Sequence, residues 1–452
     1  EEAIADYDKA LEFKPDLHEA WFNRGHALGD LGRLEEALAS FDKALEFKPD
    51  KHEAWFNRGI VLGKLGRLED AIADYDKALE FKPEDLEAWF NRGVALDNVG
   101  RHEEAIADYD KALEFKPDLH EAWNNRGVAL GNLGRHEEAI ASYDKALEIK
   151  PDFHVAGSNR GIALDDLGRL VEDTIASYDK ALEFKPDNHE AWHNWGNAMY
   201  NLGSLEDAIA SYDKALEFKP DYHAAWLSRG NALDNLGRLE DAIASYDKAL
   251  EIKPDYREAW FNRGVALYNL GWLEEAIASY DKALEIKPDN HEAWNNRGIA
   301  LDNLGKFKDA IASYDKALEF KPDYHEYWSN RGVALYNLGR LEDAIASYDK
   351  ALEFKPDYHE AWLSRGFALR NLRRLEEAIA SYDKALKFKP DYHQAFYNKA
   401  CCYGLRSQIY QVIQNLQRAI DLNPDEYREI AKTDSDFDSI RSDTRFQALI
   451  QE

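Results

Sequence analysis

Histidine is the residue type in this chain best suited to bind a metal or transfer a proton, and there are fourteen of them. Most stand at one point of a repeating pattern, as His18, His52, His120, His291 and His359 do. A metal site needs several ligands within a few ångströms, whereas each copy of the pattern supplies one histidine. Neither HExxH nor CxxC occurs. We therefore predict that these histidines begin surface helices and that the chain holds no metal and no other cofactor.

Serine, histidine and aspartate recur together, and so do glycine-rich stretches such as residues 127–134, GVALGNLG. A Ser-His-Asp triad needs one residue of each type converging in space, but here they recur in every copy at positions suited to capping and packing. The glycine stretch lacks the Lys-Ser/Thr pair with which a P-loop binds phosphate and Mg²⁺. We predict a protein that is not an enzyme.

The elements that position these residues follow a fixed period. All thirteen prolines occupy one place in the repeating unit: Pro15, Pro49, Pro83, Pro117, Pro151, Pro186, Pro220, Pro254, Pro288, Pro322, Pro356, Pro390 and Pro424. Their spacing is 34 residues, and 35 between Pro151 and Pro186. A period of this length indicates a solenoid of stacked supersecondary units.

The unit at residues 120–153 predicts two helices. In the first, Asp118 is a candidate N-cap and Glu121 could bond back to its amide, as in a capping box. Trp123 begins an apolar pattern at helical spacing. Gly134 is expected to end this helix because glycine tolerates a positive φ.

The second helix of the unit begins near Glu137 and Glu138, whose negative charge suits the positive end of a helix dipole. Its apolar stripe includes Tyr143. Lys150 favours the carboxyl end, and Pro151 prevents continuation. The unit is therefore a helical hairpin of 34 residues.

At these residues the unit resembles the tetratricopeptide repeat (TPR), which has the signature carried here by Trp123, Gly127, Ala139, Tyr143, Ala146 and Pro151. It departs where Arg126 and Leu130 stand in place of the usual leucine and aromatic residue. The resemblance implies an all-α, right-handed superhelical solenoid whose first helices line a concave groove that holds extended peptides. The chain is similar to bacterial tandem arrays with a closing C-terminal segment.

The period divides the chain into an orphan second helix, a run of complete repeats and a capping segment. The orphan helix is 1–17 and the cap is 427–452, where Phe437, Ile440, Phe446 and Leu449 could cover the last hairpin. The twelve repeats between them are 18–51, 52–85, 86–119, 120–153, 154–188, 189–222, 223–256, 257–290, 291–324, 325–358, 359–392 and 393–426.

The repeat at 154–188 is the irregular one. Gly157 replaces the tryptophan, Thr174 replaces an alanine, and an extra residue lies near Val171. Losing a core aromatic typically costs about 3–5 kcal/mol, so we expect the softest junction of the array here. Sequence alone leaves open whether this is drift of a repeat or a functional hinge.

Composition limits the partners. The net charge of −29 spreads over the repeats as an excess of about two acids in each, which disfavours binding to a nucleic-acid backbone. The two cysteines, Cys401 and Cys402, are adjacent and cannot staple the fold, which favours a reducing, cytoplasmic compartment. The sequence contains no run of eighteen apolar residues, so it predicts no membrane span.

Asparagine supplies the candidate binding chemistry. Asn125 and Asn132 are seven residues apart and so share one helix face. A carboxamide both donates and accepts hydrogen bonds, so it can pair with a peptide backbone without reading its sequence. The pattern is similar to the asparagine ladders of superhelical TPR arrays. With Asn125 and Asn132, the equivalent asparagines that we predict to bind a peptide as a ladder are Asn91, Asn98, Asn194, Asn201, Asn235, Asn262, Asn269, Asn296, Asn303, Asn330 and Asn337.

Neighbouring side chains on this face would give specificity. The candidates are Phe56, Phe90, His193, Asn197, Tyr200, Tyr268 and Tyr336. Glu121 and its equivalents add negative charge at the groove edge, which favours a protein or peptide with Lys or Arg. Arg126 and its counterparts could reach the second-helix aspartate, Asp144, and we predict a repeated structural ion pair.

These observations predict a non-catalytic scaffold that holds an extended protein segment in its groove. The alternative is that the array is the recognition arm of a larger bacterial signalling or defence protein, with an enzymatic domain upstream such as a caspase-like protease, an NTPase or a kinase. Because Glu1 falls inside a second helix of the pattern, we expect the native chain to continue upstream. Oligomeric state and partner identity stay open.

Overall fold

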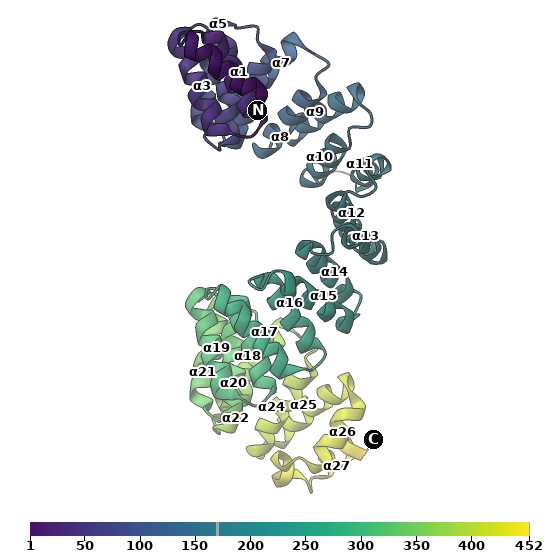
Figure 1. Ribbon diagram of the computed structural model, residues 1–452. Coiled ribbons are helices and arrows are strands. Elements are labelled where there is room, and N and C mark those ends of the chain that lie inside the picture. Colours follow the sequence, from purple (N-terminus) through teal and green to yellow (C-terminus); the bar gives the residue numbers. More distant parts are fainter. Residues whose placement is uncertain (169–170, 452) are drawn as a thin grey trace. The chain divides into compact units, whose positions relative to one another are not determined.

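The computed structural model describes residues 1–168 and 171–451. In those ranges every regular element is a helix, which confirms the all-α prediction. The chain divides into two compact units, Glu1–Ala232 and Leu233–Glu452, and each is described on its own. Within each unit the helices follow one another as side-by-side pairs (Figure 1).

The first unit holds α1 (Glu2–Phe13), α2 (His18–Asp30), α3 (Leu34–Phe47), α4 (His52–Lys64), α5 (Leu68–Phe81), α6 (Leu86–Asn98), α7 (His102–Phe115), α8 (His120–Asn132), α9 (His136–Ile149), α10 (His154–Asp166), α11 (Val171–Phe184), α12 (His189–Leu202) and α13 (Leu205–Phe218). The boundary between the units falls within α14 (His223–Asn235). Even-numbered helices are the first helices of the repeats, and odd-numbered ones are the second.

The second unit holds α15 (Leu239–Ile252), α16 (Arg257–Asn269), α17 (Leu273–Ile286), α18 (His291–Asn303), α19 (Phe307–Phe320), α20 (His325–Asn337), α21 (Leu341–Phe354), α22 (His359–Asn371), α23 (Leu375–Phe388), α24 (His393–Leu405), α25 (Ile409–Leu422), α26 (Pro424–Thr433), the 3₁₀ helix η1 (Ser435–Ile440) and α27 (Thr444–Gln451). Phe437, Ile440, Phe446 and Leu449 of the closing segment are buried against the last hairpin.

The core of most repeats is a tyrosine of the second helix lying on a glycine of the first; Phe41 takes this place in the first repeat, and Leu416 with Ala400 in the last. Tyr143 is 4% exposed, and a Cβ added to Gly127 would stand 2.5 Å from its ring. The same contact recurs in other repeats, as at Gly298 and Tyr314. Only glycine lets the tyrosine ring approach the first helix this closely.

The turns between first and second helices depend on a left-handed residue, as predicted for Gly134, whose φ is +73°. Glycine fills this place through most of the chain, but Arg373 and Ser407 adopt positive φ at the corresponding turns of the last two repeats. A non-glycine residue costs about 1–2 kcal/mol in this conformation. These two turns are therefore strained by comparison with the others.

The predicted capping box at Asp118 and Glu121 is wrong. The N-cap of α8 is Leu119, one residue later, and it makes no side-chain cap bond, because the chain bends through Pro117 and Asp118 before the helix begins. Where aspartate or asparagine occupies the later position, its side chain does cap the helix. The caps of this kind are Asp85, Asn188 and Asn290, each accepting from the backbone N–H three residues on.

In most repeats a tryptophan side chain joins the first helix to the repeat before it. The Nε1–H of Trp123 donates to the carbonyl of Pro117 at 2.9 Å. The same bond is present at Trp21, Trp55, Trp89, Trp192, Trp226, Trp260, Trp294, Trp328 and Trp362. Because the proline ends the preceding second helix, each bond joins two consecutive repeats.

The repeated ion pair exists, but its predicted partner is wrong. Arg126 Nε donates to Asp110 of the preceding repeat at 2.6 Å, and Arg126 Nη1 donates to Ser142 Oγ at 2.7 Å. Asp144 receives Arg160 of the following repeat instead. The side chain points back along the array, because each first helix packs between two second helices.

The aspartate keeps a donor even where the arginine is replaced. Trp195 donates its Nε1–H to Asp179 at 2.8 Å, and Lys399 donates to Asp383 at 2.6 Å. A donor at this point of the first helix therefore links neighbouring repeats whichever side chain carries it.

Two complete repeats carry an aspartate at the position where most of the others have the serine. Asp108 receives Arg92 Nη1 at 2.8 Å with its side chain 4% exposed. Burial raises the pKa of Asp108 to about 6, and this outweighs the nearby guanidinium, which acts in the opposite direction. Burial raises the pKa of Asp74 for the same reason.

We predict that Gly127→Ala lowers the free energy of unfolding by about 1–3 kcal/mol, because its methyl group would overlap the Tyr143 ring. Gly131→Ala in the same helix is the matched control, since nothing lies within 4 Å of its Cβ position. That change should raise stability by up to about 1 kcal/mol through helix propensity. Urea unfolding followed by circular dichroism measures both. Equal effects of the two changes would contradict the packing explanation.

We predict that Asp108 makes the protein more stable on acidification from pH 7 to pH 5. The folded state holds the Asp108 proton up to about pH 6, whereas the unfolded carboxyl loses it near its ordinary pKa of 3.8, so the folded state binds more protons between these values. Asp108→Ser should remove this dependence and add about 1 kcal/mol of stability at pH 8. Ser142→Asp should introduce the same dependence. Urea unfolding midpoints measured at several pH values test this prediction. Parallel pH profiles for the parent and Asp108→Ser would contradict it.

Candidate binding surface

The candidate surface is the first-helix face that carries the two rows of asparagines, named here the carboxamide face. Asn132 and its equivalents form an exposed row near the helix ends: Asn98, Asn201, Asn235, Asn269, Asn303, Asn337 and Asn371. Asn125 and its equivalents Asn91, Asn194, Asn262, Asn296 and Asn330 are half-buried. The heptad spacing thus places one carboxamide of each pair in solvent and one deeper.

Some of these carboxamides are oriented by their own helix. Asn91 Nδ2 donates to the Glu87 carbonyl at 2.8 Å, and Asn98 Nδ2 donates to the Val94 carbonyl at 2.9 Å. Each bond uses one N–H of the amide and neither lone pair of its oxygen. An oriented acceptor therefore remains available on each of these side chains.

Other carboxamides bond across neighbouring repeats, which the sequence did not indicate. Asn303 Nδ2 donates to Tyr268 Oη at 2.7 Å, and Asn371 Nδ2 donates to Tyr336 Oη at the same distance. Tyr268 and Tyr336 are half-buried on the carboxamide face. Because tyrosine occupies this place in alternate repeats, these bonds follow a two-repeat period.

The repeat between those of Tyr268 and Tyr336 has an acidic residue at the equivalent position. Asp302 of α18 occupies the place that Tyr268 and Tyr336 occupy in α16 and α20. Burial raises the pKa of Asp302, and its Oδ1 has no hydrogen-bond partner among the described residues. Asp234 shares both properties. A buried acceptor without a donor costs free energy, so these carboxylates are places where a ligand N–H would be favourable.

A small hollow adjoins these groups. It has a volume of about 180 Å³ and is lined by Val265, Tyr268, Tyr280, Asn296 and Ile299. The residues come from α16, α17 and α18, so neighbouring first helices form it with one core tyrosine. An apolar side chain of a bound segment could enter it while its backbone meets the carboxamides.

The predicted specificity residues of the first unit mainly pack within the protein. Phe56 and Phe90 are half-buried, with ring centroids 5.9 Å and 6.0 Å from the core rings of Tyr75 and Tyr109. Asn197 accepts a hydrogen bond from Tyr212 Oη at 2.9 Å, and Tyr200 is half-buried.

His193 is a packing residue. It is 9% exposed, its Nε2 lies 3.0 Å from Ser228 Oγ, and its ring centroid is 5.1 Å from that of Tyr222. Burial lowers the pKa of His193 to about 4. A buried neutral imidazole between α12 and α14 offers little to a ligand, so its predicted groove contact finds no support in its position.

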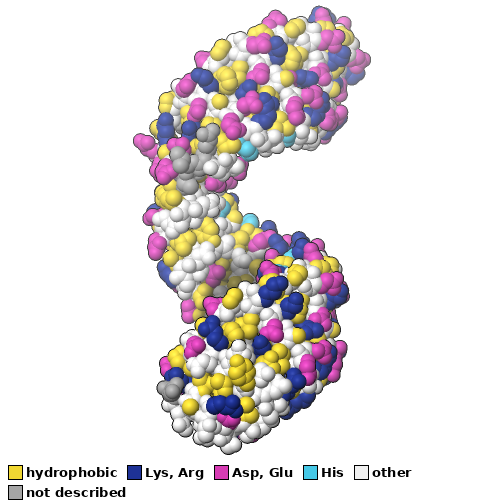
Figure 2. Space-filling view, turned by 180° about the vertical axis from the view of Figure 1, so that it is seen from behind, with side chains coloured by type: hydrophobic (Ala, Val, Ile, Leu, Met, Phe, Trp, Pro, Cys, Tyr) yellow, Lys and Arg dark blue, Asp and Glu magenta, His cyan; other side chains and the backbone are white. Residues whose placement is uncertain are grey.

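Charges of both signs surround the face. Glu121 is exposed and lies 3.0 Å from His120 Nδ1, and Glu19 is paired with Lys51 at the same distance. Acidic and basic side chains are intermixed on the part of the surface shown in Figure 2. The net acidity is thus distributed through the array.

Among the described residues, Cys401, Asp434 and Asp436 are the group whose ligand atoms come close enough to hold a metal. Their atoms are already engaged: Tyr397 Oη donates to Asp434 at 2.7 Å, and Arg370 lies 3.3 Å from Asp436. Burial raises the pKa of the Cys401 thiol, which disfavours the thiolate that a metal requires. The group therefore fits a network that ties the closing segment to the last repeats.

In the ranges 1–168 and 171–451, no helix has the length and apolar character required to cross a bilayer.

The tetratricopeptide-repeat family model matches residues 22–85, 56–120, 193–257, 227–291, 295–359 and 331–393. A second tetratricopeptide-repeat model matches 120–153, and a TPR repeat model matches 1–32. The matches cover well over half of the chain. This protein belongs to the tetratricopeptide-repeat family. No curated protein matches it.

Several solved structures resemble parts of the fold. YrrB, described as a TPR protein with an unusual peptide-binding site, is 26% identical with a TM-score of 0.38, covering 41% of this chain and 95% of its own. A tetratricopeptide-repeat protein from Parabacteroides merdae is 19% identical with a TM-score of 0.45, covering 55% and 98%. The Cut9–Hcn1 hetero-tetramer of the APC/C is 14% identical with a TM-score of 0.42, covering 96% of both chains. These similarities carry no conclusion about what this chain binds.

We predict that His193 makes the protein less stable on acidification from about pH 6.5 to pH 4. The folded state resists protonation down to about pH 4 while the unfolded histidine accepts a proton near 6.5, so the unfolded state binds more protons in this window. Phe56 occupies the equivalent position in an earlier repeat. His193→Phe should therefore weaken the dependence of stability on pH in this window. NMR titration of the His193 ring should give a midpoint near 4, and a midpoint near 6.5 would show that the ring is solvated.

Proposed function

We propose that this chain is a non-catalytic scaffold that binds an extended segment of a partner protein on the carboxamide face. One observation carries the proposal: the exposed asparagine row recurs in register with the repeats, so its donors and acceptors form a regular series. A peptide backbone offers the same alternation of N–H and C=O groups. Carboxamides can satisfy both kinds of group.

The partner segment carries Lys or Arg. Asp234 and Asp302, two repeats apart on this face, each hold a buried carboxylate oxygen that has no hydrogen-bond partner among the described residues. A charge-assisted bond from an ammonium or guanidinium group is stronger than a neutral one and would stabilise the ionised carboxylate. The acidic net charge disfavours nucleic acid as the partner.

To test this proposal, peptides from a random display library are selected for binding to the parent protein. The selected sequences should be enriched in Lys or Arg, and Asp302→Asn should weaken binding of the best peptide about tenfold through loss of one charge-assisted bond. The triple change Asn269→Ala, Asn303→Ala and Asn337→Ala should weaken it at least as much. Calorimetric titration measures these affinities.

The matched control changes lysines of the same repeats on their second helices. Lys282, Lys316 and Lys350 are exposed and pair only with glutamates three residues away. Replacing all three with alanine should leave peptide affinity within about twofold of the parent, because exposed ion pairs contribute little to stability. Equal losses in the two triple variants, or selected peptides without basic residues, would rule out the carboxamide face as the binding surface.

A further inference from the structure

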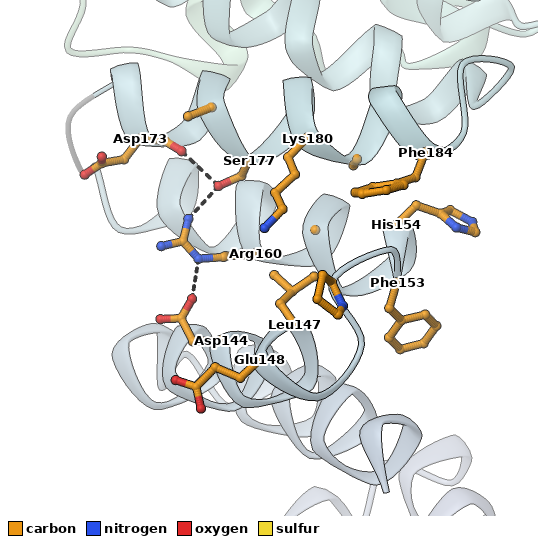
Figure 3. Close-up of a pocket in the computed structure, with 14 residues that line it drawn as sticks. Asp144, Leu147, Glu148, Phe153, His154, Arg160, Asp173, Ser177, Lys180 and Phe184 are labelled. Carbon is orange, nitrogen blue, oxygen red and sulfur yellow. Dashed lines mark hydrogen bonds and ion pairs between the residues drawn. The ribbon is translucent and has the colours of Figure 1, made fainter. Parts of the chain in front are cut away.

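A pocket opens in the repeat that lacks its tryptophan. It has a volume of about 560 Å³ and lies between α9, α10 and α11 (Figure 3). Gly157 lines it at the position where most other repeats carry tryptophan. Leu147, Pro151, Phe153 and Phe184 give it apolar walls. The volume falls in the range of small-molecule and side-chain binding pockets.

The other repeats show what this space normally holds. In the repeat beginning at His120, the Trp123 indole donates to the Pro117 carbonyl at 2.9 Å, and its ring lies 5.8 Å from the Arg126 guanidinium carbon. Elsewhere the indole also covers a second-helix leucine, as Trp192 and Trp226 do for Leu216. Each indole thus has an acceptor, a cation and an apolar surface around it.

All three of those partners remain around Gly157. The Pro151 carbonyl receives no indole N–H from the first helix that follows it, since Gly157 stands where the tryptophan would be. Arg160 is held in place by Asp144 at 2.7 Å and Ser177 at 2.6 Å, as Figure 3 shows. Leu147 is half-buried, whereas its counterpart Leu113 is buried, with 7% of its surface exposed.

A cationic and an aromatic side chain at the mouth of the pocket are further groups that could contact an indole. Lys180 points into the pocket from α11, and Phe184 forms one wall while 45% exposed. Cations favour the face of an aromatic ring, and indole is the strongest natural partner. An exposed phenylalanine gains further burial when a ring is placed against it.

We propose that this pocket takes the indole of a tryptophan side chain supplied by a partner protein. The indole N–H donates to the Pro151 carbonyl, and the ring lies between Leu147, Phe184 and Arg160. Gly157 stands two residues before Asn159, so the pocket lies on the opposite side of α10 from the carboxamide face. The proposal is therefore independent of peptide binding at that face, and either can fail alone.

The test titrates the full chain with N-acetyl-tryptophanamide, which carries the indole on a peptide-like backbone. One equivalent should bind in about the millimolar range, as expected for a ligand of this size. N-acetyl-phenylalaninamide has no ring N–H for the Pro151 carbonyl and should bind about tenfold more weakly. Calorimetry gives the affinities, and NMR saturation transfer shows which ring protons contact the protein.

Phe184→Ala removes an exposed wall and should weaken N-acetyl-tryptophanamide about fivefold to tenfold. Phe320→Ala is the matched control, because its repeat fills the equivalent space with Trp294. That control should leave the affinity unchanged. Both phenylalanines are exposed, at 45% and 43%, so neither change threatens the core.

Gly157→Trp should fill the pocket and abolish binding. Its Cβ would stand 3.2 Å from Ala181 Cβ, so α10 and α11 must separate slightly, and circular dichroism establishes whether the variant is folded. If it is not, Phe184→Ala and Phe320→Ala decide the outcome. Equal affinity for the two amides, or equal effects of the two phenylalanine changes, would overturn the proposal. Binding of free indole without N-acetyl-tryptophanamide would show a pocket too closed for a chain-borne side chain and would overturn it as well.

Discussion

A pair of short helices cannot bury its apolar faces alone, and the structure depends on the contact that lets such pairs stack. A second-helix tyrosine, such as Tyr143, lies directly on the backbone of the first helix at a glycine. The contact removes a large ring from water and fixes the distance between the two helices. Because most repeats use this contact, successive units pack in a similar way and can follow one another along the chain.

The junction between repeats is polar as well as apolar. An arginine such as Arg126 reaches back to an aspartate of the preceding repeat, and a tryptophan donates to the proline carbonyl that ends the preceding second helix. Both bonds lie at the edge of the core, where directional groups can fix register without a buried, unpaired charge. The substitution of Trp195 or Lys399 for the arginine keeps the donor to the aspartate. The junction therefore depends on a hydrogen-bond donor at that place more than on one residue type.

Two opposite sides of the first helices differ in character. The carboxamide face is polar and nearly regular, so it suits a backbone that also repeats. The Gly157 pocket is a single irregularity on the other side, where loss of one side chain exposes the apolar and polar groups that normally surround it. A regular array thus carries a repeated polar face together with one local pocket whose shape derives from the repeat itself.

Much of the fold could be predicted from the chain because its determinants are local. The proline spacing, the apolar pattern around Trp123 and the position of Gly134 each act within one helical hairpin, and the structure confirms two helices per unit with a left-handed turn at Gly134. The capping prediction failed at Asp118 because the exact first residue of a helix depends on how the preceding turn bends.

The side-chain partners were decided by tertiary structure. Periodicity placed the asparagines on one face, yet it could not show that Asn303 bonds to Tyr268 or that the donor to Asp144 comes from Arg160, because both contacts join different repeats. It also gave no indication that His193 is buried, since the covering side chains come from the next first helix. The sequence by itself determined the repeat, its two helices and the face that carries the carboxamides. Stacking decided which of those groups remain available and where the missing tryptophan leaves a pocket, because these depend on side chains that the neighbouring repeats bring within a few ångströms.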